Sequence, residues 1–172
     1  MTTSQTISGQ GSAPASPFLK TILWVGLLAG SLDILAACLQ AYLVRGTSPV
    51  IVLQFIASGA FGKPAFSGGW QMALAGLLFH FIIAYSFTAL FFLLYPFIRT
   101  LAKNITVAAI VYGMFIFVVM NLLVLPLTKI PPIAFKWDKA AMATGILIVA
   151  IGLPVAYFAR QFYRQQEAAM QA

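Results

Sequence analysis

Asp33 is the residue with the clearest chemical potential, because it is a carboxylate inside a long apolar run, residues 20–44. A carboxylate at the centre of a membrane helix costs about 2.5–3.5 kcal/mol on insertion scales, so protonation or a partner must offset that cost. Asp33 shares one helix face with residues that are small or polar: Gly26, Gly30, Ala37 and Gln40. Because small residues allow helices to approach closely, we expect Asp33 to lie between helices rather than toward lipid.

His80, the only histidine of the chain, holds a similar place in the apolar run 70–98. Its face carries a second stripe of small residues: Ala73, Gly76, Ala84 and Thr88. A weaker stripe in the run 105–127 leads to Asn121. From the rise of about 1.5 Å per residue, Asp33 lies near the midplane, with His80 roughly 5 Å and Asn121 roughly 8 Å toward the same side. The sequence thus predicts an intramembrane polar cluster of Asp33, His80, Asn121 and Gln40.

This cluster has two interpretations. In the first, Asp33 and His80 form a proton-responsive pair, because histidine changes charge near physiological pH and intramembrane acids serve as proton relays. In the second, the polar side chains only hold helices together by hydrogen bonds, which contribute about 0.6–2 kcal/mol each. The spacing leaves both open.

Other chemistry finds little support. One histidine and one cysteine, Cys38, on different helices do not make a zinc or haem site. No serine arrangement suggests nucleophilic catalysis, and no glycine loop suggests phosphate binding. We therefore expect no cofactor, no metal and no enzymatic activity. The phenylalanines of the second run, Phe87, Phe91 and Phe92, are expected to face lipid, and the aromatic and basic residues within 157–164 are expected to anchor a helix at headgroups.

The composition indicates that these segments lie in a membrane. Of the 172 residues, 62% are hydrophobic and only 8% are charged, whereas soluble domains carry about 25% charged residues. These proportions exclude a soluble enzyme, a nucleic-acid-binding protein and a disordered chain. The net charge of +7 comes from cations near the ends of apolar runs, where they reach lipid headgroups. Membrane lipids are thus the expected partners, with a second copy of the chain or another membrane protein as alternatives, and no nucleic acid.

Four membrane-spanning helices must position the polar residues, because about 20 apolar residues cross the hydrocarbon layer. The runs are 20–44, 70–98, 105–127 and 140–160. Tryptophans mark their predicted interfaces (Trp24, Trp70 and Trp137), and Pro154 is expected to kink the last helix. The predicted fold class is an all-α polytopic membrane protein. Its domain plan is a disordered tail over 1–17, one four-helix transmembrane domain over 18–164 and a short C-terminal tail over 165–172.

Residues 49–61 are apolar but too short to span the membrane. They are bounded by residues that begin and end helices: Ser48, Pro49, Gly59 and Gly62. This half-helix is predicted to lie in the interface or to re-enter the membrane, and the interfacial placement is favoured. Gln54 and Ser58, four residues apart, form its polar stripe.

The ten Lys and Arg residues divide equally between the two sides of this topology. We place both termini in the cytoplasm, because Arg99 and Lys103 share a very short loop.

The chain resembles small four-span bacterial inner-membrane proteins of unknown biochemical function, whose more distant relatives include an inner-membrane protein associated with acid resistance. The resemblance extends over residues 22–160 and rests on residues 56–59 (IASG) with 65–69 (AFSGG), 75–81 (AGLLFHF), 120–127 (MNLLVLPL) and 152–154 (GLP). It implies a bacterial inner-membrane location, the four-helix plan and a place for His80 and Asn121 in the family's pattern.

Residues and resemblance together lead to two functional expectations. The first is a non-enzymatic bundle that acts through helix–helix or lipid contacts and is linked to stress or acid. The alternative is a small proton-coupled transporter or channel element that uses Asp33 and His80.

Overall fold

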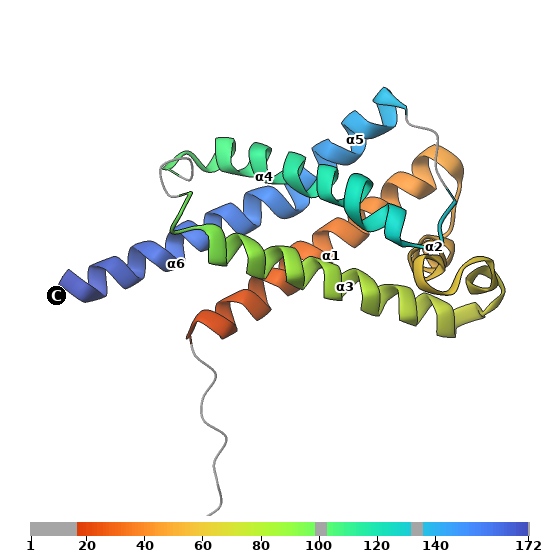
Figure 1. The fold of residues 1–172 in the computed structure, drawn as a ribbon, viewed down its shortest axis with the longest axis horizontal. Helices are drawn as coiled ribbons and strands as arrows, with labels where there is room; N and C mark the ends of the chain where they lie inside the picture. Colours follow the sequence, from red (N-terminus) through yellow and green to blue (C-terminus); the bar gives the residue numbers. More distant parts are fainter. Residues whose placement is uncertain (1–16, 99–102, 132–135, 172) are drawn as a thin grey trace, which may run out of the picture.

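The computed structural model describes residues 17–98, 103–131 and 136–171. Four helical segments within these ranges are long and apolar enough to cross a membrane (Figure 1). They are Pro17–Arg45, Gly69–Leu94, Ile105–Leu127 and Trp137–Gln171. The predicted all-α polytopic plan is confirmed, and the chain is a multi-pass integral membrane protein with a helical bundle.

The first two spans are the single helices α1 (Pro17–Arg45) and α3 (Gly69–Leu94). The other two are composite. The third consists of α4 (Ile105–Val119), the π-helical segment η3 (Met120–Val124) and the 3₁₀ turn η4 (Leu125–Leu127). The fourth consists of α5 (Trp137–Leu147), the π-helical segment η5 (Ile148–Gly152) and α6 (Leu153–Gln171). Residues 165–171, which the sequence assigned to a short tail, continue α6.

Each π-helical segment ends two residues before a proline, Pro126 in the third span and Pro154 in the fourth. Proline donates no backbone hydrogen bond, and its ring clashes with the carbonyl four residues earlier. A wider turn just before the ring accommodates both defects without ending the helix. The kink predicted at Pro154 takes this form, and the fourth span changes direction where α5 gives way to α6 (Figure 1).

The half-helix is α2 (Pro49–Phe61), with the predicted bounds. Ser48 is the N-cap residue, although its side chain makes no capping hydrogen bond, and Gly62 ends the helix at φ 71°. Gly59 lies inside α2 instead of ending it, and its carbonyl accepts a hydrogen bond from the Lys129 amide at 2.8 Å. Figure 1 shows α2 nearly end-on while the spans lie along the page, so α2 crosses the bundle at one end. This crossing favours the interfacial placement over re-entry.

Two glycines bring helix backbones into direct contact. A methyl group at Gly76 of α3 would lie 1.9 Å from the carbonyl oxygen of Leu53, so α2 packs against α3 at a site that excludes any side chain. A methyl group at Gly152 of η5 would lie 2.5 Å from the carbonyl oxygen of Ala109, so the same exclusion holds between η5 and α4. The bundle is therefore assembled through small residues, as membrane helices commonly are.

The expectation that the phenylalanines of the second span face lipid is wrong. Phe87, Phe91 and Phe92 are buried, and Phe91 packs edge-on against Tyr112 of α4 with ring centroids 4.6 Å apart. They continue the face of α3 that carries the small-residue stripe, because residues 84, 88 and 91 follow one another at helical spacing. Along this part of the face, buried aromatic rings take the place of the small residues.

Candidate intramembrane polar site

Asp33 of α1 and His80 of α3 lie on two spans that pack closely through glycine. A methyl group at Gly30 would lie 2.9 Å from the Phe81 ring and 3.1 Å from the Ala84 side chain. Asp33 follows Gly30 by about one helical turn, so its side chain leaves α1 beside this contact. His80 reaches the backbone of α1 at Gly30, three residues before Asp33.

The imidazole of His80 is oriented by a backbone carbonyl. Its Nε2 atom lies 2.9 Å from the carbonyl oxygen of Gly30. Because a carbonyl oxygen only accepts hydrogen bonds, Nε2 carries the hydrogen and Nδ1 is the nitrogen that can gain or lose a proton. A backbone hydrogen bond across the two spans thus fixes the orientation and the tautomer of the imidazole.

The Asp33 carboxylate is only partly enclosed by the protein. It is half-buried, and no side chain or backbone group in the described part of the chain donates a hydrogen bond to it. Every buried side-chain oxygen or nitrogen among the described residues has a hydrogen-bond partner. The Asp33 carboxylate has none among these residues, so its oxygens are not fully buried. No hydrogen bond or ion pair joins Asp33 to His80 within the described ranges, so a proton would pass between them through an intervening water.

The other two members of the predicted cluster point elsewhere. The amide of Gln40 contacts the Met142 sulfur of α5, with Nε2 and Sδ 2.8 Å apart. Asn121 is exposed, and its Nδ2 donates to the Phe117 carbonyl oxygen of its own helix at 2.8 Å. Asn121 lies in η3, where the π-helical turn interrupts the 3.6-residue period that aligned it with the inner face. The site therefore consists of Asp33 and His80.

The polar stripe of α2 faces α3 instead of water. Gln54 and Ser58 are both buried. The Gln54 Nε2 donates to the Gly69 carbonyl oxygen at 3.0 Å, and the Ser58 hydroxyl donates to the Phe55 carbonyl oxygen at 2.6 Å. Gln54 thereby ties α2 to the first residue of α3, which gives this stripe a structural role.

Two tyrosines also join helices, and one of them, Tyr163, was expected to lie among the headgroup-anchoring residues of 157–164. The Tyr112 hydroxyl of α4 donates to the Phe87 carbonyl oxygen, and the Tyr163 hydroxyl of α6 donates to the Phe92 carbonyl oxygen at 2.7 Å. Tyr112 lies among apolar residues in the middle of a span, and a phenol there needs a partner. The position of this tyrosine in the apolar span was therefore the sequence feature that could have predicted its interhelical hydrogen bond.

No group of three or more His, Cys, Asp or Glu side chains that could hold a metal ion occurs within the described ranges. The fold and the site together define a polytopic membrane protein of four spans, with an acidic residue and a histidine on two spans that pack together. No protein family, curated protein or solved structure matches the chain.

Proposed function

We propose that this protein is a non-enzymatic, pH-responsive membrane protein in which the protonation of Asp33 and His80 alters the packing of α1 against α3. The observation that carries the proposal is the hydrogen bond from the only histidine to the Gly30 carbonyl oxygen, about one helical turn before Asp33, on two spans that touch at Gly30. We place the protein in a bacterial inner membrane with both termini in the cytoplasm. The resemblance to four-span proteins with an acid-resistance relative supports both the location and the link to acid.

The physical coupling runs through the hydrogen bond from His80 to Gly30. When the imidazole is protonated, this bond becomes charge-assisted and hence stronger, and the cation attracts an ionised Asp33. When either residue is neutral, the attraction disappears. The contact between α1 and α3 therefore depends on the charges of both residues, and pH biases how tightly these spans pack.

The test uses the single histidine. Isotope-labelled histidine in the full-length protein, reconstituted in lipid nanodiscs, reports the titration of His80 by NMR without assignment. We expect the titration midpoint to differ between the wild type and Asp33→Asn, because the variant loses the neighbouring charge. Amide hydrogen exchange in α1 and α3 is expected to change over the same pH range as the wild-type titration.

Asp138→Asn is the matched control, since it removes one carboxylate at the exposed start of α5. It is expected to leave the His80 titration unchanged. Superimposable titrations of the wild type and Asp33→Asn would refute the proposal.

A second candidate is proton-coupled transport through the same pair. It is favoured by the open carboxylate of Asp33, which could receive a proton from Nδ1 of His80 through water and release it. Proteoliposomes with an enclosed pH-sensitive dye distinguish the two candidates. A proton flux that Asp33→Asn abolishes would support transport, whereas a pH-dependent change in hydrogen exchange without flux would support the response alone.

A further inference from the structure

The C-terminal half of α6 extends past the end of the bundle at which α1 and α4 begin (Figure 1). Tyr157 follows Trp137, which is 82% exposed, by 20 residues. At about 1.5 Å per residue this separation is roughly 30 Å, the thickness of the hydrocarbon layer. Two interfacial aromatic residues thus bracket the fourth span, and Arg160 and Arg164 follow at the level of the lipid headgroups.

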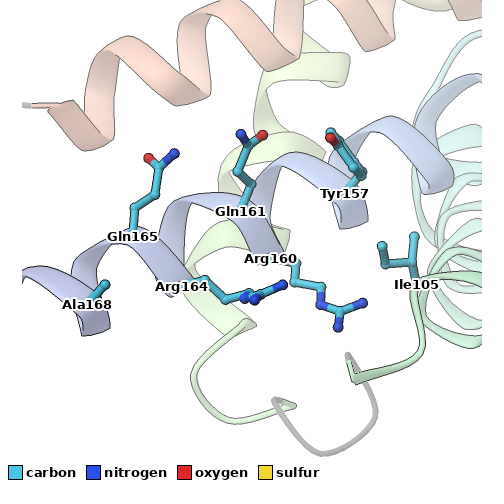
Figure 2. A pocket seen from close by; sticks show the side chains of 7 residues that line it. All are labelled: Ile105, Tyr157, Arg160, Gln161, Arg164, Gln165 and Ala168. Atoms are coloured by element: carbon cyan, nitrogen blue, oxygen red, sulfur yellow. The ribbon is translucent and has the colours of Figure 1, made fainter.

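A groove of about 450 Å³ lies at this level on the surface of α6, next to Ile105 at the start of α4. Figure 2 shows the guanidinium groups of Arg160 and Arg164 on one side of the helix and the amides of Gln161 and Gln165 on the other. All four side chains line the groove, and the spacing of four residues within each pair places the two pairs along one stretch of helix. The groove thus offers guanidinium donors on one side of α6 and amide groups on the other.

Two guanidinium groups line the groove. In the described part of the chain, neither Arg160 nor Arg164 forms an ion pair with a carboxylate. Ile105 begins α4, so the positive end of that helix dipole also faces the groove. A neighbouring groove of about 330 Å³ shares Gln161 and Gln165 and adds the ammonium group of Lys20. Two arginines therefore line the first groove, and Lys20 lines the neighbouring one.

We propose that the groove between α6 and the start of α4 binds the phosphate headgroup of an anionic phospholipid, held by Arg160 and Arg164. A guanidinium donates two parallel hydrogen bonds to a phosphate, and two guanidiniums four residues apart can contact different oxygens of one headgroup. Tyr157 and Ile105, on the bilayer side of the two arginines, lie where the glycerol and the first acyl carbons would rest. This site is independent of the Asp33–His80 pair.

The test measures the binding of a fluorescent phosphatidylglycerol to the full-length protein in a neutral detergent. Arg160→Gln with Arg164→Gln is expected to weaken the apparent Kd by about tenfold or more, because two charge-assisted contacts are lost. Lys136→Gln with Lys139→Gln is the matched control, since it removes two exposed cations at the other end of the fourth span. It is expected to change the Kd by less than about twofold.

Competition identifies the ligand. Unlabelled phosphatidylglycerol should displace the probe, whereas phosphatidylcholine and inorganic phosphate should not. Displacement by inorganic phosphate would assign the groove to a free anion, and displacement by phosphatidylcholine would show a non-specific lipid surface; either result overturns the proposal. Wild-type affinity in the double arginine variant would overturn it as well.

A conservative variant covers the case in which the glutamine substitutions prevent folding. Arg160→Lys with Arg164→Lys keeps both charges but loses the paired hydrogen bonds of each guanidinium. Binding is expected to weaken by about threefold in this variant. Unchanged affinity would refute the paired contact with phosphate.

Discussion

The contact between α2 and α3 at Gly76 makes a sharp prediction for Gly76→Ala. The added methyl group would lie 1.9 Å from the Leu53 carbonyl oxygen, 2.7 Å from the Leu53 carbonyl carbon and 3.2 Å from the Ala57 amide nitrogen. Real Cβ atoms essentially never approach a neighbour within 3.0 Å, so the two backbones must separate by about 1.1 Å, from 1.9 to 3.0 Å. No side-chain rotation can relieve this clash, because every obstructing atom belongs to the backbone.

Overpacking of a tight contact costs about 1–3 kcal/mol and occasionally more. Because the obstacle is backbone, we expect a cost at the upper end of this range, about 3 kcal/mol. Alanine has a better helix propensity than glycine, and this gain offsets about 1 kcal/mol of the cost. The expected net loss is about 2 kcal/mol. For a chain of this length it corresponds to a fall in Tm of roughly 4–8 °C.

The assay is thermal unfolding of the purified protein in one detergent, followed by circular dichroism. Gly145→Ala is the matched control, because Gly145 also lies inside a helix, yet a methyl group there would meet no atom within 4 Å. It should leave Tm unchanged or raise it by roughly 2–4 °C, through the gain of up to about 1 kcal/mol in helix propensity. If Gly76→Ala and Gly145→Ala unfold at the same temperature, the close approach of α2 to α3 is refuted.

Three further changes test other contacts by the same unfolding assay. Gly152→Ala brings a methyl group 2.5 Å from the Ala109 carbonyl oxygen and should destabilise the protein about as much as Gly76→Ala, with additive losses in the double variant because the two contacts share no helix pair. A double variant whose loss of stability differs from the sum of the two single losses would show that the two contacts are coupled. Asn104→Ala removes the oxygen that accepts hydrogen bonds from the first turn of α4 and should cost about 1 kcal/mol, with faster amide exchange confined to that turn. Tyr112→Phe removes the hydroxyl that binds the Phe87 carbonyl and should cost about 0.5–1.5 kcal/mol; an unchanged Tm would show that this bond adds nothing to stability.

The sequence placed two residues of the predicted polar cluster correctly on the inner faces of their helices and misplaced a third. Asp33 and His80 lie on spans that pack together near Gly30, because each residue lies on a stripe of small residues and such stripes mark the inner faces of membrane helices. Asn121 was placed by the same reasoning yet lies on the exposed side, since the π-helical turn that precedes Pro126 ends the helical period there. A local pattern is reliable only while the helix that carries it stays regular.

Length and apolarity alone set the number of spans, their approximate ends and the bounds of α2, because the thickness of the hydrocarbon layer and the chemistry of helix capping act on residues close in sequence. Which helix each inner face meets was decided only by tertiary packing. The Leu53 carbonyl fills the space beside Gly76, the Gly30 carbonyl orients His80, and buried aromatic rings take the place of the small residues along part of α3. These contacts join residues far apart in sequence, and their geometry depends on how closely whole helices approach one another, a distance that no single helix pattern encodes.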